Sequence, residues 1–133
     1  MPQDIFADKK NKVIDPTCGD GQFLSEIIIR KMENGCTYEE ALSSTYGVDM
    51  KIDNCHECIR RLYGINGDPA IETILKDDIP DELSNWKKTG VIAIFKVNGK
   101  VCNIVCANGL EYNYRFGKEK LAEELFSWIV KIR

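Results

Sequence analysis

The sequence predicts an α/β fold, in which short apolar strands alternate with amphipathic helices. An apolar strand at 13–15 leads through a glycine turn into a helical pattern, and a β-rich stretch at 45–49 leads into a second helical pattern at 52–63. Strands that alternate with helices in this way form a parallel sheet. Two later β-rich runs, 90–97 and 100–106, are separated by the dipeptide Asn-Gly, which predicts a β-hairpin.

The composition is that of one globular domain spanning 1–133. The chain has 133 residues, of which 44% are hydrophobic and 29% charged, enough for one core. The net charge of −3 argues against a broad DNA-binding surface, because phosphate contacts need clustered lysines and arginines. The first residues are polar and acidic, and no apolar run approaches the length of a membrane span, so we expect a cytoplasmic protein without a signal peptide or membrane contact.

The six cysteines are expected to be reduced, since disulfides persist mainly in secreted proteins. The C-x-x-C run at 55–58 is compatible with a zinc site in which Cys102 and Cys106 form the second pair. Zinc sites favour pairs on knuckle turns, however, whereas these cysteines fall within a helical pattern and an apolar strand. We therefore expect buried thiols and no metal, with His56 exposed.

Helix boundaries follow from capping and breaking signals. A helix is expected from Gly21 to about Asn34, and a capping box formed by Thr37 and Glu40 starts a short one after it. Further helices are expected at 70–75 and 118–132. The apolar positions of the first helix that should face the sheet are Phe23, Leu24, Ile27, Ile28 and Met32.

The stretch from Val13 to Leu24 is a strand, a tight glycine turn and the start of a helix. Gly19 and Gly21 can adopt positive φ and allow a ligand to approach the backbone. The first N–H groups of the following helix would point at that ligand. An ordinary strand–helix turn is the alternative. A dinucleotide site is disfavoured because Leu24 stands where the third glycine of G-x-G-x-x-G belongs.

The full string D-P-T-C-G-D-G-Q-F-L, residues 15–24, resembles motif I of the S-adenosylmethionine-dependent DNA methyltransferases of the N6-adenine type. The resemblance implies a partial class I methyltransferase (Rossmann-like) three-layer sandwich that binds S-adenosylmethionine or its demethylated product. It also implies a set of cofactor-binding residues in this stretch, namely Asp15, Pro16, Thr17, Cys18, Gly19, Gly21 and Phe23.

The second β-rich stretch ends in Tyr46-Gly47-Val48-Asp49, which resembles motif II of the same family. There the acid accepts hydrogen bonds from both ribose hydroxyls of the cofactor. The resemblance thus assigns Asp49 to the ribose, with Met50 or Ile52 flanking the adenine ring. The alternative for Asp49 is a capping role at the next helix.

The segment 103–108 resembles motif III, in which a strand ends in an acid that accepts a hydrogen bond from the adenine amine. Asn108 stands at that position, and its amide can both accept and donate. A simple Asn-Gly turn is the alternative for Asn108, and Asp77 competes for the motif III role. A further resemblance would make Phe6 the motif X aromatic near the methionine part of the cofactor. Too few residues separate it from Val13 for a full helix and loop, which favours the alternative of a frayed terminus or a hydrophobic anchor.

Motif IV, (D/N/S)-P-P-(Y/F), holds the flipped adenine in this family, and no Pro-Pro occurs in the sequence. No catalytic residue can therefore be named. The chain looks like the cofactor half of a methyltransferase of the restriction–modification kind, inactive in isolation and able to act on DNA only if completed by another polypeptide. The alternative is a non-catalytic module that pairs with a methyltransferase or sequesters cofactor.

The family's strand order 3-2-1-4-5 places strand one in the centre of the sheet. Without strands four and five, the strand at 13–15 becomes an edge, and exposed apolar edges invite pairing. We therefore expect a cover over this edge, from the terminal helix, the hairpin or a second copy in a homo-oligomer.

Overall fold

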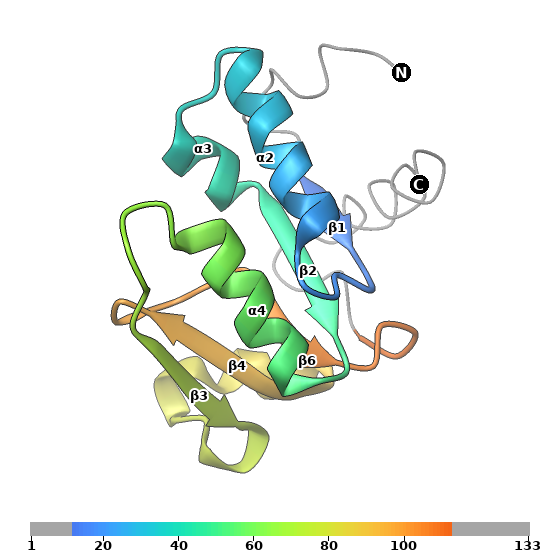
Figure 1. Ribbon diagram of the computed structural model, residues 1–133. Helices are drawn as coiled ribbons and strands as arrows, with labels where there is room; N and C mark the ends of the chain where they lie inside the picture. The colour runs from blue at the N-terminus through green and yellow to red at the C-terminus, as the bar shows by residue number, and fades with distance from the viewer. Residues whose placement is uncertain (1–11, 113–133) are drawn as a thin grey trace.

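The computed structural model describes residues 12–112 as a mixed α/β fold built on one mixed sheet (Figure 1). The elements run in the order β1 (Val13–Asp15), α2 (Gln22–Glu33), α3 (Tyr38–Ser43), β2 (Thr45–Asp49), α4 (Ile52–Tyr63), β3 (Ile71–Leu75), the 3-10 helices η1 (Lys76–Asp78) and η2 (Asp81–Thr89), β4 (Val91–Val97), β5 (Lys100–Val101) and β6 (Ile104–Ala107).

The strands lie in the order β1-β2-β6-β4-β3, and β5 pairs with β4. Strands β1, β2 and β6 are parallel to one another, whereas β4 is antiparallel to both β6 and β3. The carboxyl ends of β1, β2 and β6 therefore meet at one edge of the sheet. Since β6 lies beside β2, it occupies the place of the third parallel strand.

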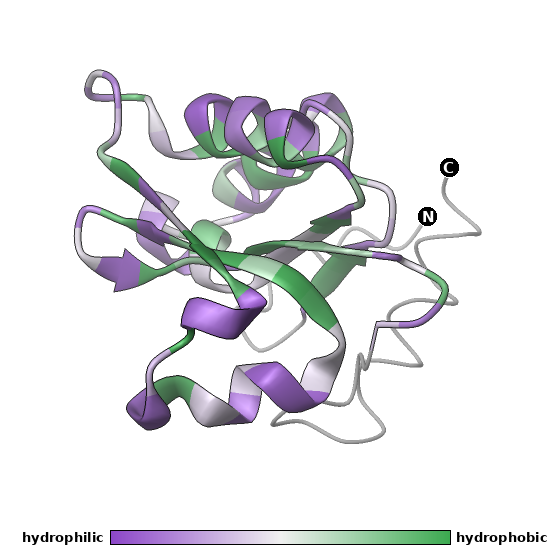
Figure 2. Cartoon of the chain, turned by 90° about the horizontal axis from the view of Figure 1, so that it is seen from below, coloured by the Kyte–Doolittle hydropathy of each residue, from purple (hydrophilic) through white to green (hydrophobic). Residues whose placement is uncertain are grey.

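Two apolar layers cover the two faces of the sheet (Figure 2). One is formed with α2 and α4 and includes Leu24, Ile59 and Phe95. The other lies under η1 and η2 and includes Ile79 and Ile94, with half-buried Trp86 packed against it. The α/β class expected from the sequence is confirmed, with a sheet that is mixed.

The predicted hairpin is confirmed between β4 and β5. Asn98 and Gly99 connect them with φ values of 52° and 88°, the positive values that a two-residue type I′ turn requires. After β5 the chain pairs with β4 again, so that β6 continues antiparallel to it, with a register irregularity between Val91 and Ala93.

The expected helix at 70–75 is wrong, because Ile71–Leu75 forms strand β3. Its residues pair with β4 over the full length, from Ile71 opposite Val97 to Leu75 opposite Ala93. The segment contains two isoleucines and a threonine, whose branched side chains suit a strand, and the partner strand offers a ladder that a short isolated helix lacks. The helix predicted at 118–132 lies outside the described residues.

Strand β1 lies at the edge of the sheet, with β2 as its neighbour among the described strands. Val13, Ile14 and Asp15 are nevertheless all buried. The edge position agrees with the expectation from the sequence. The β4–β5 hairpin does not pair with this edge, since β2 and β6 lie between β1 and β4. The terminal helix lies outside the described residues, and cover by a second copy remains a prediction.

Helix α2 ends close to the predicted position, and a glycine with positive φ follows it. Gly35, with φ 107°, donates its N–H to the Met32 carbonyl at 3.1 Å, and the Cys36 N–H reaches the Lys31 carbonyl at 3.0 Å. The two bonds form a Schellman motif. The capping box of α3 is also confirmed, with Thr37 and Glu40 bonded to each other's backbone N–H groups.

The buried face of α2 differs from the expectation at one position. Met32 is 41% exposed, and Lys31 is buried in its place. The Lys31 ammonium donates to the Ser44 carbonyl at 3.1 Å and to the Ser44 hydroxyl at 2.6 Å, at the end of α3. Burial lowers the pKa of Lys31 from its ordinary 10.5 to about 8.

This burial predicts a pH-dependent contribution of Lys31 to stability. Below pH 8 lysine is charged in both the folded and the unfolded states, so the desolvation cost is present in full. Between about pH 8 and 10.5 the folded state carries neutral Lys31 while the unfolded state is still charged, and the cost disappears. We expect the free energy of unfolding of the wild type, relative to Lys31→Met, to rise by about 3 kcal/mol across this range.

Urea denaturation at pH 7.5, 9 and 10.5 measures this difference. Because the same thiols and tyrosines titrate in both proteins, their effects cancel on subtraction. Lys88→Met, which removes an exposed lysine, serves as the control and should show no such rise. A flat difference for Lys31→Met would contradict the assignment.

Candidate functional site

Two adjoining hollows open at the carboxyl edge of β1, β2 and β6. The larger, of about 650 Å³, is lined by Pro16, Thr17, Asp49, Met50, Lys51, Asn54, Asn108, Gly109 and Leu110. The smaller, of about 390 Å³, is lined by Thr17, Cys18, Gly19, Asp20, Gln22, Phe23 and Glu26. Thr17 borders both, so the loop after β1 forms the ridge between them.

The loop after β1 is fixed by its own turn and by β2. Gly19 and Gly21 have φ values of 55° and 87°, in the left-handed region that glycine adopts without cost. The Gly21 N–H donates to the Cys18 carbonyl at 2.9 Å, which closes the turn. The Cys18 N–H donates to the Val48 carbonyl at 2.8 Å and so ties the loop to the end of β2.

The carboxylate of Asp49 joins three segments of the site. Its Oδ2 accepts the Gly19 N–H at 3.0 Å, which brings the glycine loop and the end of β2 together. Its Oδ1 accepts the backbone N–H of Lys51 at 2.9 Å and the side-chain amide of Asn54 at 3.1 Å. Asp49 thus holds the residues at the start of α4 and borders the larger hollow. It is not the N-cap that the alternative interpretation proposed, because Lys51 holds that position.

Asn108 follows β6 directly and lies on the wall of the larger hollow, as Asp49 does. Its Oδ1 accepts the Leu110 N–H at 3.0 Å, which folds the following turn. Asp77 follows β3, at the opposite edge of the sheet, and lines neither hollow. Of the two motif III candidates, Asn108 is therefore the one that shares a hollow with Asp49.

Exposed apolar side chains border the larger hollow. Met50 is 62% exposed and Leu110 is 94% exposed. Such side chains offer apolar contact to a ring held between them. The other side chain suggested for the adenine, Ile52, is half-buried against the core and does not line the hollow.

Two of the predicted site residues support the loop from below. Asp15 is fully buried, and its Oδ1 accepts the Thr17 N–H at 3.0 Å. Gly21 is packed so tightly on α4 that a Cβ there would lie 2.9 Å from the Cys58 sulfur and 3.1 Å from the Cys58 Cα. Neither residue lines a hollow, and neither do the alternative candidates Ile52 and Asp77. The remaining predicted residues that the structure describes all do: Pro16, Thr17, Cys18, Gly19, Phe23, Asp49, Met50 and Asn108. Phe6 lies outside the described residues.

Several lining residues were not predicted. Asn54 lies five residues after Asp49, within the first turn of α4, where a polar side chain can return to the acid. Gln22 and Glu26 are spaced i, i+4 and therefore share a face of α2. The spacing in both cases was a signal that the sequence carried.

The cysteines beneath the site are buried and protonated. The pKa of the Cys18 thiol is raised by its hydrogen bond to Cys58 and by burial, and burial also raises the pKa of the Cys55 and Cys106 thiols. Cys55 donates to the Val105 carbonyl at 3.4 Å and Cys106 to the Met50 carbonyl at 3.3 Å. Within residues 12–112, no group of three or more His, Cys, Asp or Glu side chains is placed to hold a metal ion.

His56 is half-buried, in contrast to the exposure expected. Its Nε2 lies 2.7 Å from the Thr73 hydroxyl, and its ring contacts Phe95 edge-on with centroids 5.4 Å apart. His56 thus joins α4 to strands β3 and β4, and it lines neither hollow. The strand at Ile71–Leu75, which the sequence had predicted as a helix, supplies the partner that covers it.

No protein-family model, curated protein or solved structure matches the chain. In the described part, no helix is both long enough and apolar enough to cross a membrane.

The packing of Gly21 on Cys58 makes a stability prediction. Gly21→Ala combines an unfavourable φ with a contact that α4 can relieve only by moving away, and we expect a loss of about 2 to 4 kcal/mol in the free energy of unfolding. Gly35→Ala is the matched control, because Gly35 also has positive φ at a helix end but has open space around it. It should cost about 1 kcal/mol in urea denaturation. Equal losses for the two variants would contradict the close approach of α4.

Proposed function

We propose that the chain binds S-adenosylmethionine at the carboxyl edge of its sheet, as the cofactor-binding part of a DNA adenine-N6 methyltransferase-like protein of the class I fold. The observation that carries this proposal is the hydrogen bond from the Gly19 N–H to the Asp49 carboxylate. It brings a glycine-rich turn and an acid at the end of the adjacent parallel strand into one site. Ligands of open α/β sheets bind at this end of the strands.

The two hollows suit the two ends of this cofactor. The larger is bordered by Asp49, Asn108 and exposed apolar side chains, which fit a ribose and an adenine. The smaller is bordered by the acids Asp20 and Glu26, which favour the cationic ammonium and sulfonium groups of the methionine part. A ligand that lies across Thr17 would occupy both.

The hydrogen bonds of Asp49 limit how it can hold a ribose. A carboxylate has about four acceptor sites, and three are used by Gly19, Lys51 and Asn54. One hydroxyl can therefore bind at Oδ2 without any rearrangement. The second hydroxyl expected from the family pattern binds only if the Asn54 amide turns away from Oδ1, and that amide is then available to the ligand itself.

A second candidate function is a non-catalytic module that pairs with a methyltransferase or sequesters cofactor. The absence of any Pro-Pro from the sequence favours it, since the family holds the target adenine with that motif. Both functions need the same cofactor site. They differ in whether another polypeptide supplies the base-binding half and the contact with DNA.

Calorimetry with S-adenosylmethionine tests the binding site. We expect the wild type to bind and Asp49→Ala to bind about ten- to a hundredfold more weakly, because charge-assisted hydrogen bonds to the ligand and to Gly19 are lost. Asp53→Ala is the matched control. It removes an exposed acid four residues after Asp49, in the first turn of α4. This acid does not line the hollows.

The absence of measurable heat with the wild type would overturn the proposed function. Equal binding by Asp49→Ala and the wild type would show that the ligand lies elsewhere. Adenosine and methionine, titrated separately, assign the two hollows, since Asp49→Ala should weaken the former and leave the latter nearly unchanged.

The missing motif IV predicts the activity of the isolated chain. With labelled S-adenosylmethionine and an adenine-containing duplex, we expect no transfer of the methyl group above background, because no residue pattern for holding the flipped base is present. Methylated adenine found in the digested product would contradict this expectation. A known adenine methyltransferase assayed in parallel provides the positive control.

A further inference from the structure

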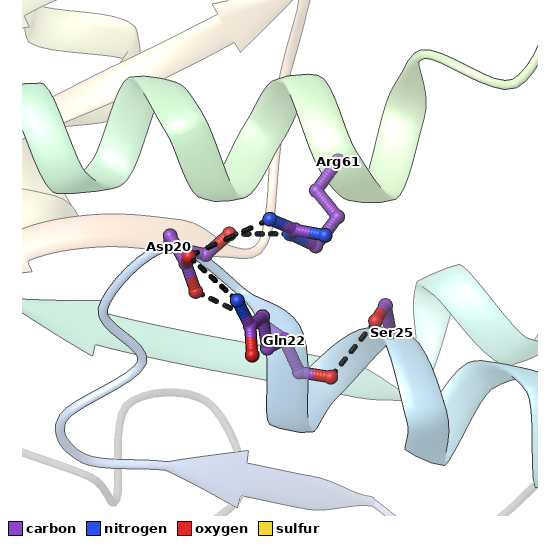
Figure 3. Close-up of polar contacts among 4 residues, drawn as sticks. All are labelled: Asp20, Gln22, Ser25 and Arg61. Atoms are coloured by element: carbon purple, nitrogen blue, oxygen red, sulfur yellow. Dashed lines mark hydrogen bonds and ion pairs between the residues drawn. The ribbon is translucent and has the colours of Figure 1, made fainter.

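The last turn of α4 contacts the glycine loop, residues 19–21, through the side chain of Arg61 (Figure 3). Arg61 donates from Nε to the Asp20 carbonyl at 3.0 Å, and its Nη2 lies 3.5 Å from Asp20 Oδ2. Cys58, one turn earlier on the same helix, is the residue against which Gly21 is packed. One face of α4 therefore contacts two consecutive residues of the loop.

Asp20 is held from the other side by the start of α2. Its Oδ1 accepts the Gln22 N–H at 3.2 Å and its Oδ2 accepts the Gln22 side-chain amide at 3.2 Å (Figure 3). These contacts are local and do not fix the loop relative to the rest of the molecule. The bond to Arg61 does, because it spans 41 residues of the chain.

The loop needs such a restraint because of its composition. Asp20 stands between Gly19 and Gly21, and glycines on both sides allow the two intervening peptide groups to rotate at little cost. Rotation of the Asp20–Gly21 peptide would point its carbonyl elsewhere and break the Gly21 N–H bond to Cys18. Arg61 binds that carbonyl directly and opposes this rotation.

We propose that Arg61 is a positioning residue that holds the glycine loop in the conformation that receives the ligand. The proposal rests on the proposed function and names a residue that the motif resemblance does not supply. Helix α4 then positions one acid at each of the two hollows. Its first turn holds Asp49 through Lys51 and Asn54, and its last turn holds Asp20 through Arg61.

The exposure of the pair distinguishes positioning from stabilisation. The Arg61 and Asp20 side chains are 42% and 48% exposed, and exposed ion pairs contribute little to the stability of a fold. Loss of Arg61 should therefore leave the thermal midpoint of unfolding nearly unchanged. The effect should appear instead in the mobility of the loop and in ligand affinity.

The test compares Arg61→Gln with Arg60→Gln in the full chain. Arg60 is the preceding residue of α4, is similarly exposed, and pairs with Glu57 on its own helix rather than with the loop. The two variants remove the same charge one residue apart. Arg61→Lys provides a conservative variant that keeps the charge without the planar pair of donors.

Two measurements are made on each protein: amide hydrogen exchange of Gly19–Gly21 without ligand, and calorimetry with S-adenosylmethionine. We expect Arg61→Gln to exchange faster in the loop and to bind about fivefold more weakly. Arg60→Gln should match the wild type in both measurements, and Arg61→Lys should lie between them. Unchanged loop exchange in Arg61→Gln would overturn the proposal, and so would equal weakening of binding by both glutamine variants.

The exchange measurement keeps this proposal separate from the proposed function. If the wild type does not bind S-adenosylmethionine, the proposed function fails and the ligand-receiving role of Arg61 fails with it. Faster exchange confined to Arg61→Gln would still show that Arg61 restrains the loop. If the wild type binds and exchange is unchanged, the proposed function stands and Arg61 has no positioning role.

Discussion

The hydrogen bond between the Gly19 N–H and the Asp49 carboxylate is the contact on which the rest of the site depends. It joins two loops that leave adjacent parallel strands, and it does so only because β1 and β2 run in the same direction. This bond holds the loop after β1, and that loop separates the two hollows. The mixed sheet places β6 beside β2, so that Asn108 closes the larger hollow from the other side.

Burial and packing beneath the site hold the two ends of the loop, Cys18 and Gly21, whereas the Asp20 carbonyl between them is bonded to Arg61. Asp15 is fully buried under the loop, Gly21 is in contact with Cys58, and the Cys18 N–H is bonded to β2. The thiols in this layer are protonated and act as small apolar groups with weak donors. The buried residues beneath the site are closely packed, whereas the exposed side chains Met50 and Leu110 at its border can adapt to a ligand.

The local signals in the sequence predicted the strand, turn and helix that border the hollows and part of the rest of the fold. The glycine turn, the capping box and the Asn-Gly hairpin each depend on a few neighbouring residues, and the structure agrees with all three. The strand at 71–75 and the burial of Lys31 depend on partners far along the chain, β4 and Ser44, which local periodicity does not reveal. The contact of Arg61 with Asp20 could not be predicted either, because the two residues are 41 positions apart in the sequence.

The position of β6 between β2 and β4 has a consequence for the order of folding. Strands β1 and β2 with helices α2 to α4 come from one continuous stretch, whereas β6 must insert beside β2 from far along the chain, as the 50 residues between Cys55 and its acceptor Val105 show. Contacts of long sequence separation require a costly loop closure and form late. We therefore expect the glycine turn and Asp49 to assemble before the wall that carries Asn108. A ligand that bridges the two would act on the final step of folding, and would draw the chain toward its completed form by mass action.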